Sequence, residues 1–241
     1  ELVIDGRRRI WLAGSGADYI GVLDTGQQRV AKLTLTRYPV LRVDRLAPDS
    51  DGIWFSAADR PALGRMDADG SQLELEPLTG LTGTAGDLAV ADGAVWLAAA
   101  SAPQIVRYDP VSGALSMLAL PFAEARASQL LVVGDRVAVL DRGRGMLGLL
   151  DPRSGAYLEY PVPLRGELLA AGDGRGRIWL VTTGSQPQLV SFDAGSRRFS
   201  ESSPLAVPVD GDAMIYSAHD AALWLSGDRH LIRVPVGPAG R

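Results

Sequence analysis

A short apolar phrase, usually with a central tryptophan, recurs about every 42 residues along this chain. The copies are Ile10-Trp11-Leu12, Ile53-Trp54-Phe55, Val95-Trp96-Leu97, Val137-Ala138-Val139, Ile178-Trp179-Leu180 and Leu223-Trp224-Leu225. A repeat of this length, in segments that look like short strands, is typical of a β-propeller, in which each repeat forms one blade. We therefore predict an all-β chain that folds as a six-bladed β-propeller, with about four antiparallel strands in each blade.

The second repeat shows how one blade divides into strands. Asp49-Ser50-Asp51-Gly52 has the residues of a tight turn, and in the outermost segment leucines alternate with glutamates at 74 and 76. From the innermost strand outward, this pattern predicts strands at 41–47, 53–57, 63–67 and 73–78.

The repeat sets the expected organisation of the chain. One domain, 1–241, is predicted, with blades at about 1–40, 41–80, 81–121, 122–163, 164–208 and 209–241. The last repeat runs into Pro235, Gly237, Pro238 and Gly240, so its outer strand is expected to be missing. Open strand edges invite aggregation. Blade six therefore either stays three-stranded or takes its outer strand from residues that precede Glu1 in a longer parent protein.

Two residue types in the repeat are predicted to have structural roles. The tryptophans are expected to fill the space between neighbouring blades, since large aromatic side chains dominate such cores. An aspartate ends each of the first five third strands, just before a turn that contains Gly or Pro, and such residues form turns. These aspartates are Asp24, Asp67, Asp109, Asp151 and Asp193.

Composition excludes several classes of protein. The chain has no cysteine, so disulfides and cysteine metal sites are excluded, and it contains no apolar run long enough for a transmembrane helix. The net charge is −4, which argues against a nucleic-acid partner. The Gly-rich stretch 172–176 lacks the Lys-Ser/Thr ending of a phosphate loop. No direct membrane insertion by this segment is expected.

The second repeat also resembles a known family. Asp51-Gly52-Ile53-Trp54-Phe55-Ser56, Leu63-Gly64-Arg65-Met66 and Asp69-Gly70 are similar to the repeat of the streptogramin (virginiamycin B) lyases and related bacterial propellers. Tyr38-Pro39-Val40 and Tyr160-Pro161-Val162-Pro163 look like that family's blade-ending phrase. The resemblance covers the whole chain at the level of the repeat, and it implies the propeller fold.

The resemblance does not extend to the residues that the lyases use. The family is seven-bladed and opens a cyclic depsipeptide by a Mg²⁺-assisted elimination that needs a Pro-His phrase at an inner strand and glutamates, one of them just after a second strand. Both histidines here, His219 and His230, lie elsewhere. The residues after the second strands are Gly14, Ala57, Ala99, Asp141, Thr182 and Gly227, of which only Asp141 is acidic. No catalytic residue is therefore assigned.

The starts of the inner strands form the first candidate binding site. In a propeller these positions converge on the central channel, and they are Asp44, Asp87, Gln129, Glu167 and Asp212. Crowded carboxylates repel each other and need a counter-charge. Ca²⁺ or Mg²⁺ held by Asp87, Glu167 and Asp212 would supply it, as would a cationic ligand. The alternative is that Arg42, Arg45 and channel water neutralise the ring.

Asp-Arg pairs between the second and third strands form the second candidate. They are Asp59-Arg60, Asp141-Arg142 and Asp228-Arg229, in blades two, four and six. Exposed ion pairs contribute little stability. The pairs are therefore either solvated loop residues or part of a polar face that binds a protein.

These observations favour a non-catalytic binding or sensing module. We expect it to be the extracytoplasmic, periplasmic or cell-surface, interaction domain of a larger bacterial protein that recognises a protein, peptide or glycan. Its contacts would come from the inner-strand starts and from Asp141 and Arg142. One alternative is a metal-dependent lyase or hydrolase that acts at the central channel, and another is an architectural spacer without a small ligand.

Overall fold

The chain folds into six antiparallel β-sheets, one for each repeat. The computed structural model describes residues 2–5, 7, 9–13, 19–24, 26–35, 41–81, 83–99, 101–227 and 230–236. The chain divides into two compact units, Glu1–Leu130 and Leu131–Arg241. None of the described residues forms a helix long and apolar enough to cross a membrane.

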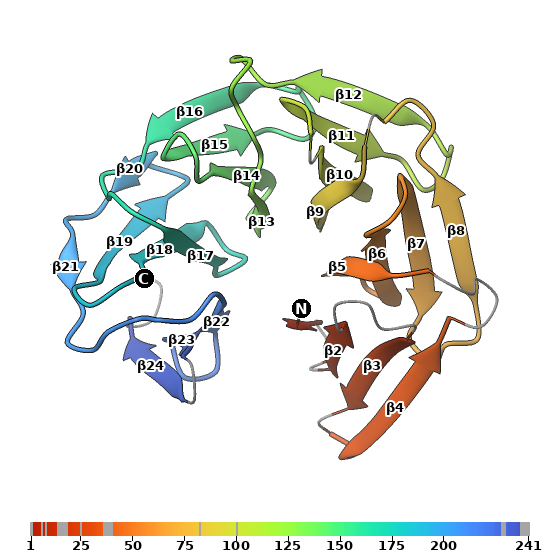
Figure 1. Ribbon diagram of the computed structural model, residues 1–241, viewed down its shortest axis with the longest axis horizontal. Helices are drawn as coiled ribbons and strands as arrows, with labels where there is room; N and C mark the ends of the chain where they lie inside the picture. The colour runs from red at the N-terminus through yellow and green to blue at the C-terminus, as the bar shows by residue number, and fades with distance from the viewer. Residues whose placement is uncertain are drawn as a thin grey trace. The chain divides into compact units, whose positions relative to one another are not determined.

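The first unit holds blades one to three (Figure 1). Blade one is β1 (Leu2–Ile4), β2 (Arg9–Ala13), β3 (Tyr19–Asp24) and β4 (Arg29–Thr34). Blade two is β5 (Val43–Pro48), β6 (Gly52–Ala57), β7 (Ala62–Asp67) and β8 (Leu73–Pro77). Blade three is β9 (Ala85–Ala91), β10 (Ala94–Ala99), β11 (Gln104–Tyr108) and β12 (Leu115–Ala119).

The second unit holds most of blade four and all of blades five and six. Blade four is β13 (Gln129–Val133), β14 (Arg136–Asp141), β15 (Met146–Leu150) and β16 (Tyr157–Pro161). Blade five is β17 (Leu168–Gly172), β18 (Arg177–Thr182), β19 (Gln188–Asp193), β20 (Arg198–Phe199) and β21 (Ser203–Pro204). Blade six is β22 (Met214–Ser217), β23 (Ala222–Ser226) and β24 (Leu231–Pro235).

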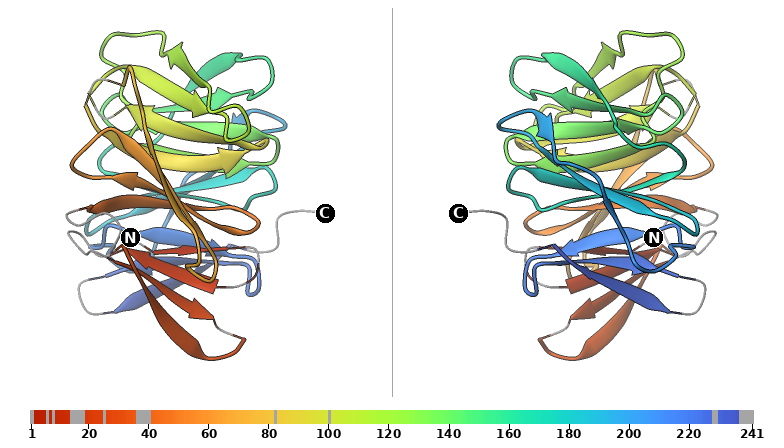
Figure 2. Two further views of the ribbon diagram at one scale, coloured as in Figure 1. Left: turned by 90° about the vertical axis from the view of Figure 1, so that its right-hand side faces the viewer. Right: turned by 90° about the vertical axis from the view of Figure 1, so that its left-hand side faces the viewer.

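The prediction of a six-bladed all-β propeller is confirmed, and the last sheet has three strands in the part of the chain that the structure describes. The strands predicted for blade two agree with β5 to β8 to within two residues at each end. Blade five differs from the simple four-stranded pattern, because the short strands β20 and β21 both pair with β19. The side views in Figure 2 show the twist of the strands within the sheets.

The core lies between neighbouring blades, and four of the five tryptophans are buried as predicted, whereas Trp224 is half-buried. The second strand of a blade is covered on both faces: every residue of β6 and of β10 is buried. Trp11 packs with blade-two residues such as Leu41 and Leu46, and Trp54 packs with blade-three residues such as Leu97. In the second unit Trp179 packs in the same way with residues of blade six.

A buried indole N–H without a hydrogen-bond acceptor costs free energy, as at Trp179, whose Nε1 has no partner among the described residues, whereas three other blades provide an acceptor of the same residue type. Trp11, Trp54 and Trp224 donate their Nε1–H to aspartates between the first and second strands, Asp5, Asp49 and Asp220, at 2.9, 3.0 and 3.2 Å. Trp96 donates instead to the Ala91 carbonyl at 3.3 Å.

An arginine completes this arrangement in the same three blades. The guanidinium groups of Arg9, Arg65 and Arg233 pair with those aspartates at 2.6, 3.3 and 3.0 Å. The guanidinium of Arg9 also lies 5.1 Å from the centre of the Trp11 ring, and that of Arg65 lies 5.8 Å from the Trp54 ring. We call this set of three side chains the Asp–Trp–Arg anchor.

The aspartates at the ends of the third strands form turns, as predicted. Asp24, Asp109, Asp151 and Asp193 each accept backbone N–H bonds from residues two or three positions later, at 2.7 to 3.1 Å. Blade two departs from this pattern. Asp67 binds the Arg65 guanidinium, and the turn bond is made by Asp69, which accepts the N–H of Ser71.

The first prediction concerns the Trp54 anchor. Replacing a buried aromatic side chain by alanine leaves a cavity, so Trp54→Ala should lower the free energy of unfolding by about 3–5 kcal/mol. Trp54→Phe keeps much of the ring and removes the indole N–H, so it should cost less. Urea denaturation of the three proteins measures the difference. Equal stability of the parent and Trp54→Ala would mean that the indole does not support the blade.

The second prediction is that the anchors make stability depend on pH. Burial opposes ionisation of Asp5 and of Asp49, but hydrogen bonds and the nearby guanidinium outweigh burial and lower the pKa of both carboxyl groups. A carboxyl whose pKa is lower in the folded state stabilises the fold above its unfolded pKa of about 3.9. This stabilisation is lost as the pH falls through the folded pKa.

The urea midpoint should therefore fall as the pH drops below about 3.9 and toward the lowered pKa values of Asp5 and Asp49. Asp5→Asn and Asp49→Asn should each flatten this fall, because an amide does not titrate there. A midpoint that changes equally with pH in the parent and in both variants would contradict the assignment.

Candidate binding groove

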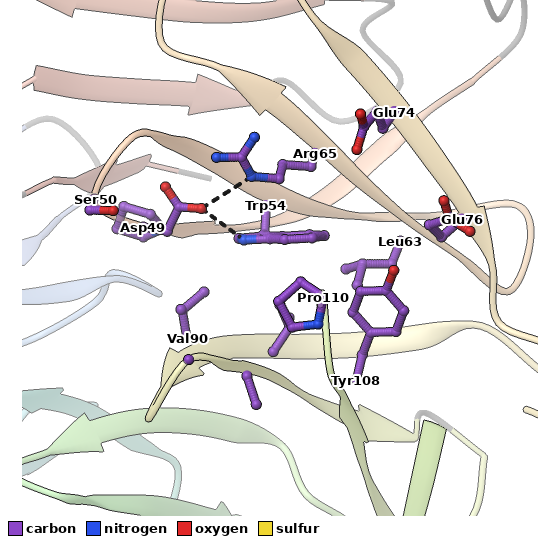
Figure 3. A pocket seen from close by; sticks show the side chains of 14 residues that line it. Asp49, Ser50, Trp54, Leu63, Arg65, Glu74, Glu76, Val90, Tyr108 and Pro110 are labelled. Atoms are coloured by element: carbon purple, nitrogen blue, oxygen red, sulfur yellow. Dashed lines mark hydrogen bonds and ion pairs between the residues drawn. The ribbon is translucent and has the colours of Figure 1, made fainter. Parts of the chain in front are cut away.

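An open groove of about 870 Å³ lies between blades two and three of the first unit (Figure 3). This volume lies in the range of ligand pockets in proteins. Its lining residues are Pro48, Asp49, Ser50, Trp54, Leu63, Arg65, Glu74, Glu76, Val90, Gly93, Ala94, Val95, Tyr108 and Pro110.

Blade two contributes the charged wall of the groove through strand register. Arg65 on β7 lies directly opposite Glu74 on β8, and Leu63 lies opposite Glu76. Directly paired residues share a face of an antiparallel sheet, so these four side chains point to the side of blade two that carries Trp54, the partner of Arg65 on β6. The alternation of leucine and glutamate in β8 therefore points both carboxylates toward the groove.

Asp49 fixes one end of this wall. It accepts the backbone N–H bonds of Asp51 and Gly52, both at 2.7 Å, as well as the bonds from Trp54 and Arg65. Burial opposes its ionisation, but the two backbone bonds and the Arg65 charge hold the pKa of Asp49 below its usual range. Asp49 is therefore a carboxylate at neutral pH, and Arg65 balances its charge.

Blade three contributes the aromatic wall. The ring of Tyr108 meets that of Trp54 edge-on, with centroids 5.9 Å apart and an interplanar angle of 65°. Burial, followed by the charges of Glu76 and Glu74, raises the pKa of the Tyr108 hydroxyl, so the phenol stays neutral at physiological pH. Val90 and Pro110 continue this wall (Figure 3).

The groove therefore combines an aromatic surface with negative charge. Glu74 and Glu76 are exposed, and neither side chain has an ion pair or hydrogen bond within the described part of the chain. With Asp49 balanced by Arg65, these two carboxylates leave the lining with an excess of negative charge. Such a surface suits a positively charged group that can pair with carboxylates and lie against an aromatic ring.

The predicted site residues of the first unit lie at the inner strands and not in this groove. Asp44 is in β5, with its carboxylate 3.8 Å from the Arg45 guanidinium. The carboxylate of Asp87 in β9 accepts the backbone N–H of Leu130 at 2.7 Å, and Gln129 is the first residue of β13. Asp87 thereby connects the inner strand of blade three to the start of blade four.

The other two inner-strand residues belong to the second unit. Glu167 is exposed and directly precedes β17, and Asp212 accepts a 3.3 Å hydrogen bond from the Ser226 hydroxyl. Within the described ranges, no group of three or more His, Asp or Glu side chains is arranged to hold a metal ion. The cation site formed by Asp87, Glu167 and Asp212 from both units stays a prediction.

The three Asp-Arg pairs do not share one structure. Asp59 and Arg60 form an exposed ion pair at 2.8 Å. Asp141 ends β14, is buried, and accepts the backbone N–H of Arg144 at 3.1 Å. The pair Asp228-Arg229 and the phrase Tyr38-Pro39-Val40 lie outside the described residues.

Arg142 has a structural contact of its own, because its Nε donates to the Leu168 carbonyl at 2.8 Å and so connects blade four to β17 of blade five. Asp141 and Arg142 thus both have structural contacts, and their role in ligand binding stays a prediction.

Sequence reasoning missed the groove, although two signals for it were present. Four of the first five repeats have an apolar residue before the aspartate that ends the third strand, and the third repeat has Tyr108. The second repeat places two glutamates on the same face of an outer strand. Only the packing of blade two against blade three brings these residues together.

The comparisons with known proteins show the fold. No known family model matches the chain, and no curated protein matches its sequence significantly. Among solved structures, virginiamycin B lyase from Staphylococcus aureus has a TM-score of 0.79 at 16% identity, covering 98% of this chain and 79% of that one. A streptogramin B lyase has a TM-score of 0.75 at 15% identity, covering 98% and 82%.

A third similar structure is part of a protein complex and is not described as a lyase. A chain of the mitotic checkpoint complex has a TM-score of 0.71 at 13% identity, covering 98% of this chain and 77% of that one. The structural likeness confirms the resemblance to streptogramin lyases that the repeat predicted. Identities this low establish a shared propeller fold, and propellers with one fold carry many functions.

The third prediction separates a structural role of Asp87 from metal binding. Asp87→Ala leaves the buried N–H of Leu130 without its acceptor, so it should lower the free energy of unfolding by about 1–3 kcal/mol even in EDTA. Thermal melting in EDTA and in millimolar Mg²⁺ or Ca²⁺ measures this. A metal-dependent rise in the Tm of the parent, absent in Glu167→Gln and in Asp212→Asn, would instead establish the predicted cation site.

Proposed function

We propose that this protein is a non-catalytic binding module whose groove between blades two and three recognises a basic segment of a partner protein. The partner would insert an arginine or lysine side chain between Tyr108 and the carboxylates of Glu74 and Glu76. The observation that carries the proposal is the pair of unpartnered carboxylates beside an aromatic ring in a groove of about 870 Å³.

The chemistry of the groove supports a cationic group more than a neutral one. A guanidinium can pair with a carboxylate through two parallel hydrogen bonds and can stack on an aromatic ring at the same time. A neutral glycan would use the aromatic wall but would leave both glutamates without a counter-charge. The pocket is also open, which suits the side chain of an extended peptide.

A role in protein binding agrees with the use of the fold elsewhere, since one similar chain is part of the mitotic checkpoint complex. In this protein, the anchor of Asp49, Trp54 and Arg65 holds the blade-two wall of the groove in a preformed geometry. A preformed site binds with a smaller loss of conformational entropy. The extracytoplasmic location stays a proposal that is based on the sequence alone, and it does not depend on the groove.

The fourth prediction tests the ligand class. Selection from a library of random peptides displayed on a surface should enrich sequences that contain arginine or lysine. For a selected peptide, the double variant Glu74→Gln/Glu76→Gln should weaken binding by at least about tenfold, because bonds to charged groups contribute about 1.5–3 kcal/mol each. Isothermal titration calorimetry measures the change, and affinity should fall as salt concentration rises.

The matched control is Glu124→Gln/Glu201→Gln, which removes two exposed carboxylates that are not among the lining residues of the groove and changes the net charge equally. It should bind as the parent does. Both double variants should keep the parent's stability, because exposed substitutions seldom exceed about 0.5 kcal/mol.

Two outcomes would overturn the proposal. One is selection of peptides without basic residues. The other is a glycan that binds the parent, loses affinity in Tyr108→Ala, and keeps it in the glutamate variants.

A further inference from the structure

A second cleft lies between blades four and five, at the position in the repeat where the groove lies between blades two and three. In both cases one side is the turn between the first two strands of a blade, and the other side comes from turns of the next blade. The cleft has a volume of about 240 Å³. It is lined by Val133, Gly134, Asp135, Arg136, Arg175, Gly176, Ala194, Gly195 and Arg197.

This cleft is built differently because blade four lacks the tryptophan. Ala138 stands at that position, completely buried among residues of blades four and five that include Phe192. No indole is present to bind a carboxylate, so the Asp–Trp–Arg anchor does not form in this blade. Asp135, in the turn before β14, has a side chain that is 79% exposed, and it lies 3.8 Å from the Arg136 guanidinium.

Three arginines therefore line this small cleft, and Asp135 is the one carboxylate in its lining, while Arg136 also interacts with the charge of Asp151. Arg175 and Arg197 are exposed, and their guanidinium groups have no ion pair or hydrogen bond with any described residue. Like charges held near one cleft repel each other unless a counter-ion lies between them. The three glycines of the lining carry no side chain, so the backbone is accessible between the guanidinium groups.

We propose that this cleft is a binding site for a small polyvalent oxyanion, one that carries phosphate or carboxylate groups. The guanidiniums of Arg136, Arg175 and Arg197 would hold its oxygens by charge-assisted, bidentate hydrogen bonds. This site is independent of the basic-segment groove, since it lies in the other unit and has the opposite charge.

The size of the cleft limits the ligand. A volume of about 240 Å³ is below that of most pockets for drug-sized molecules, so the site fits a compact anion or a single anionic head group. The acidic net charge of the chain, −4, argues against a long polyanion.

The experiment uses pyrophosphate and citrate as probes, each titrated calorimetrically into the whole chain against sodium chloride of equal ionic strength. Saturable binding of at least one probe, and none of chloride, is expected. The probe that binds more tightly identifies the group, phosphate or carboxylate. The absence of saturable binding for both probes would overturn the proposal.

The variants test the position of the site. Arg175→Gln/Arg197→Asn should weaken binding at least about tenfold, since bonds to charged groups are strong. Asparagine suits position 197 because that residue has a φ of 58°, which asparagine tolerates. Asp135→Asn should strengthen binding, because it removes the one carboxylate of the lining.

The matched control is Arg29→Gln/Arg165→Gln, which removes two exposed arginines outside the cleft and changes the net charge equally. It should bind each probe as the parent does. Equal weakening in both double variants would show general charge attraction and would overturn the site.

Discussion

The structure depends on burying the flat side of one blade against the next, and the tryptophan of the second strand does this in most repeats. An indole is large enough to fill the gap between two twisted sheets, but burying its N–H without an acceptor costs free energy. In three blades an aspartate accepts that hydrogen bond and an arginine balances the aspartate. One aromatic ring thus determines the positions of two charged residues beside it.

The same geometry explains why sites can form between blades. The inner and second strands are constrained by packing, as the fully buried β6 and β10 show. The outer strands and the turns carry little of the core, so their charges can vary from blade to blade. Blade two uses that freedom for Glu74 and Glu76, whereas the cleft between blades four and five is lined by Arg136 of blade four and by Arg175 and Arg197 of blade five. Two equivalent positions of one repeat thereby acquire opposite charge.

The features that repeat from blade to blade could be predicted from the sequence, and the features that differ between blades could not. Strand order, the turn aspartates and the packing of the tryptophans all follow from period and residue type. The inner strands are less regular: the pairing shifts between Val43 and Leu46 in blade two, and between Leu97 and Ala99 in blade three. Bulges of this kind re-aim side chains, so sequence spacing alone does not place Asp44 or Asp87.

The sequence by itself determined the fold, because the period of about 42 residues and the recurring Trp phrase allow few other arrangements. It also determined which residues pack and which form turns, since those roles depend on local chemistry. Only the tertiary structure decided which side chains meet across blades. Tyr108 and Glu76 are 32 positions apart and share a groove because two sheets pack face to face. Contacts of that kind depend on register and twist, which the order of residues along one strand does not reveal.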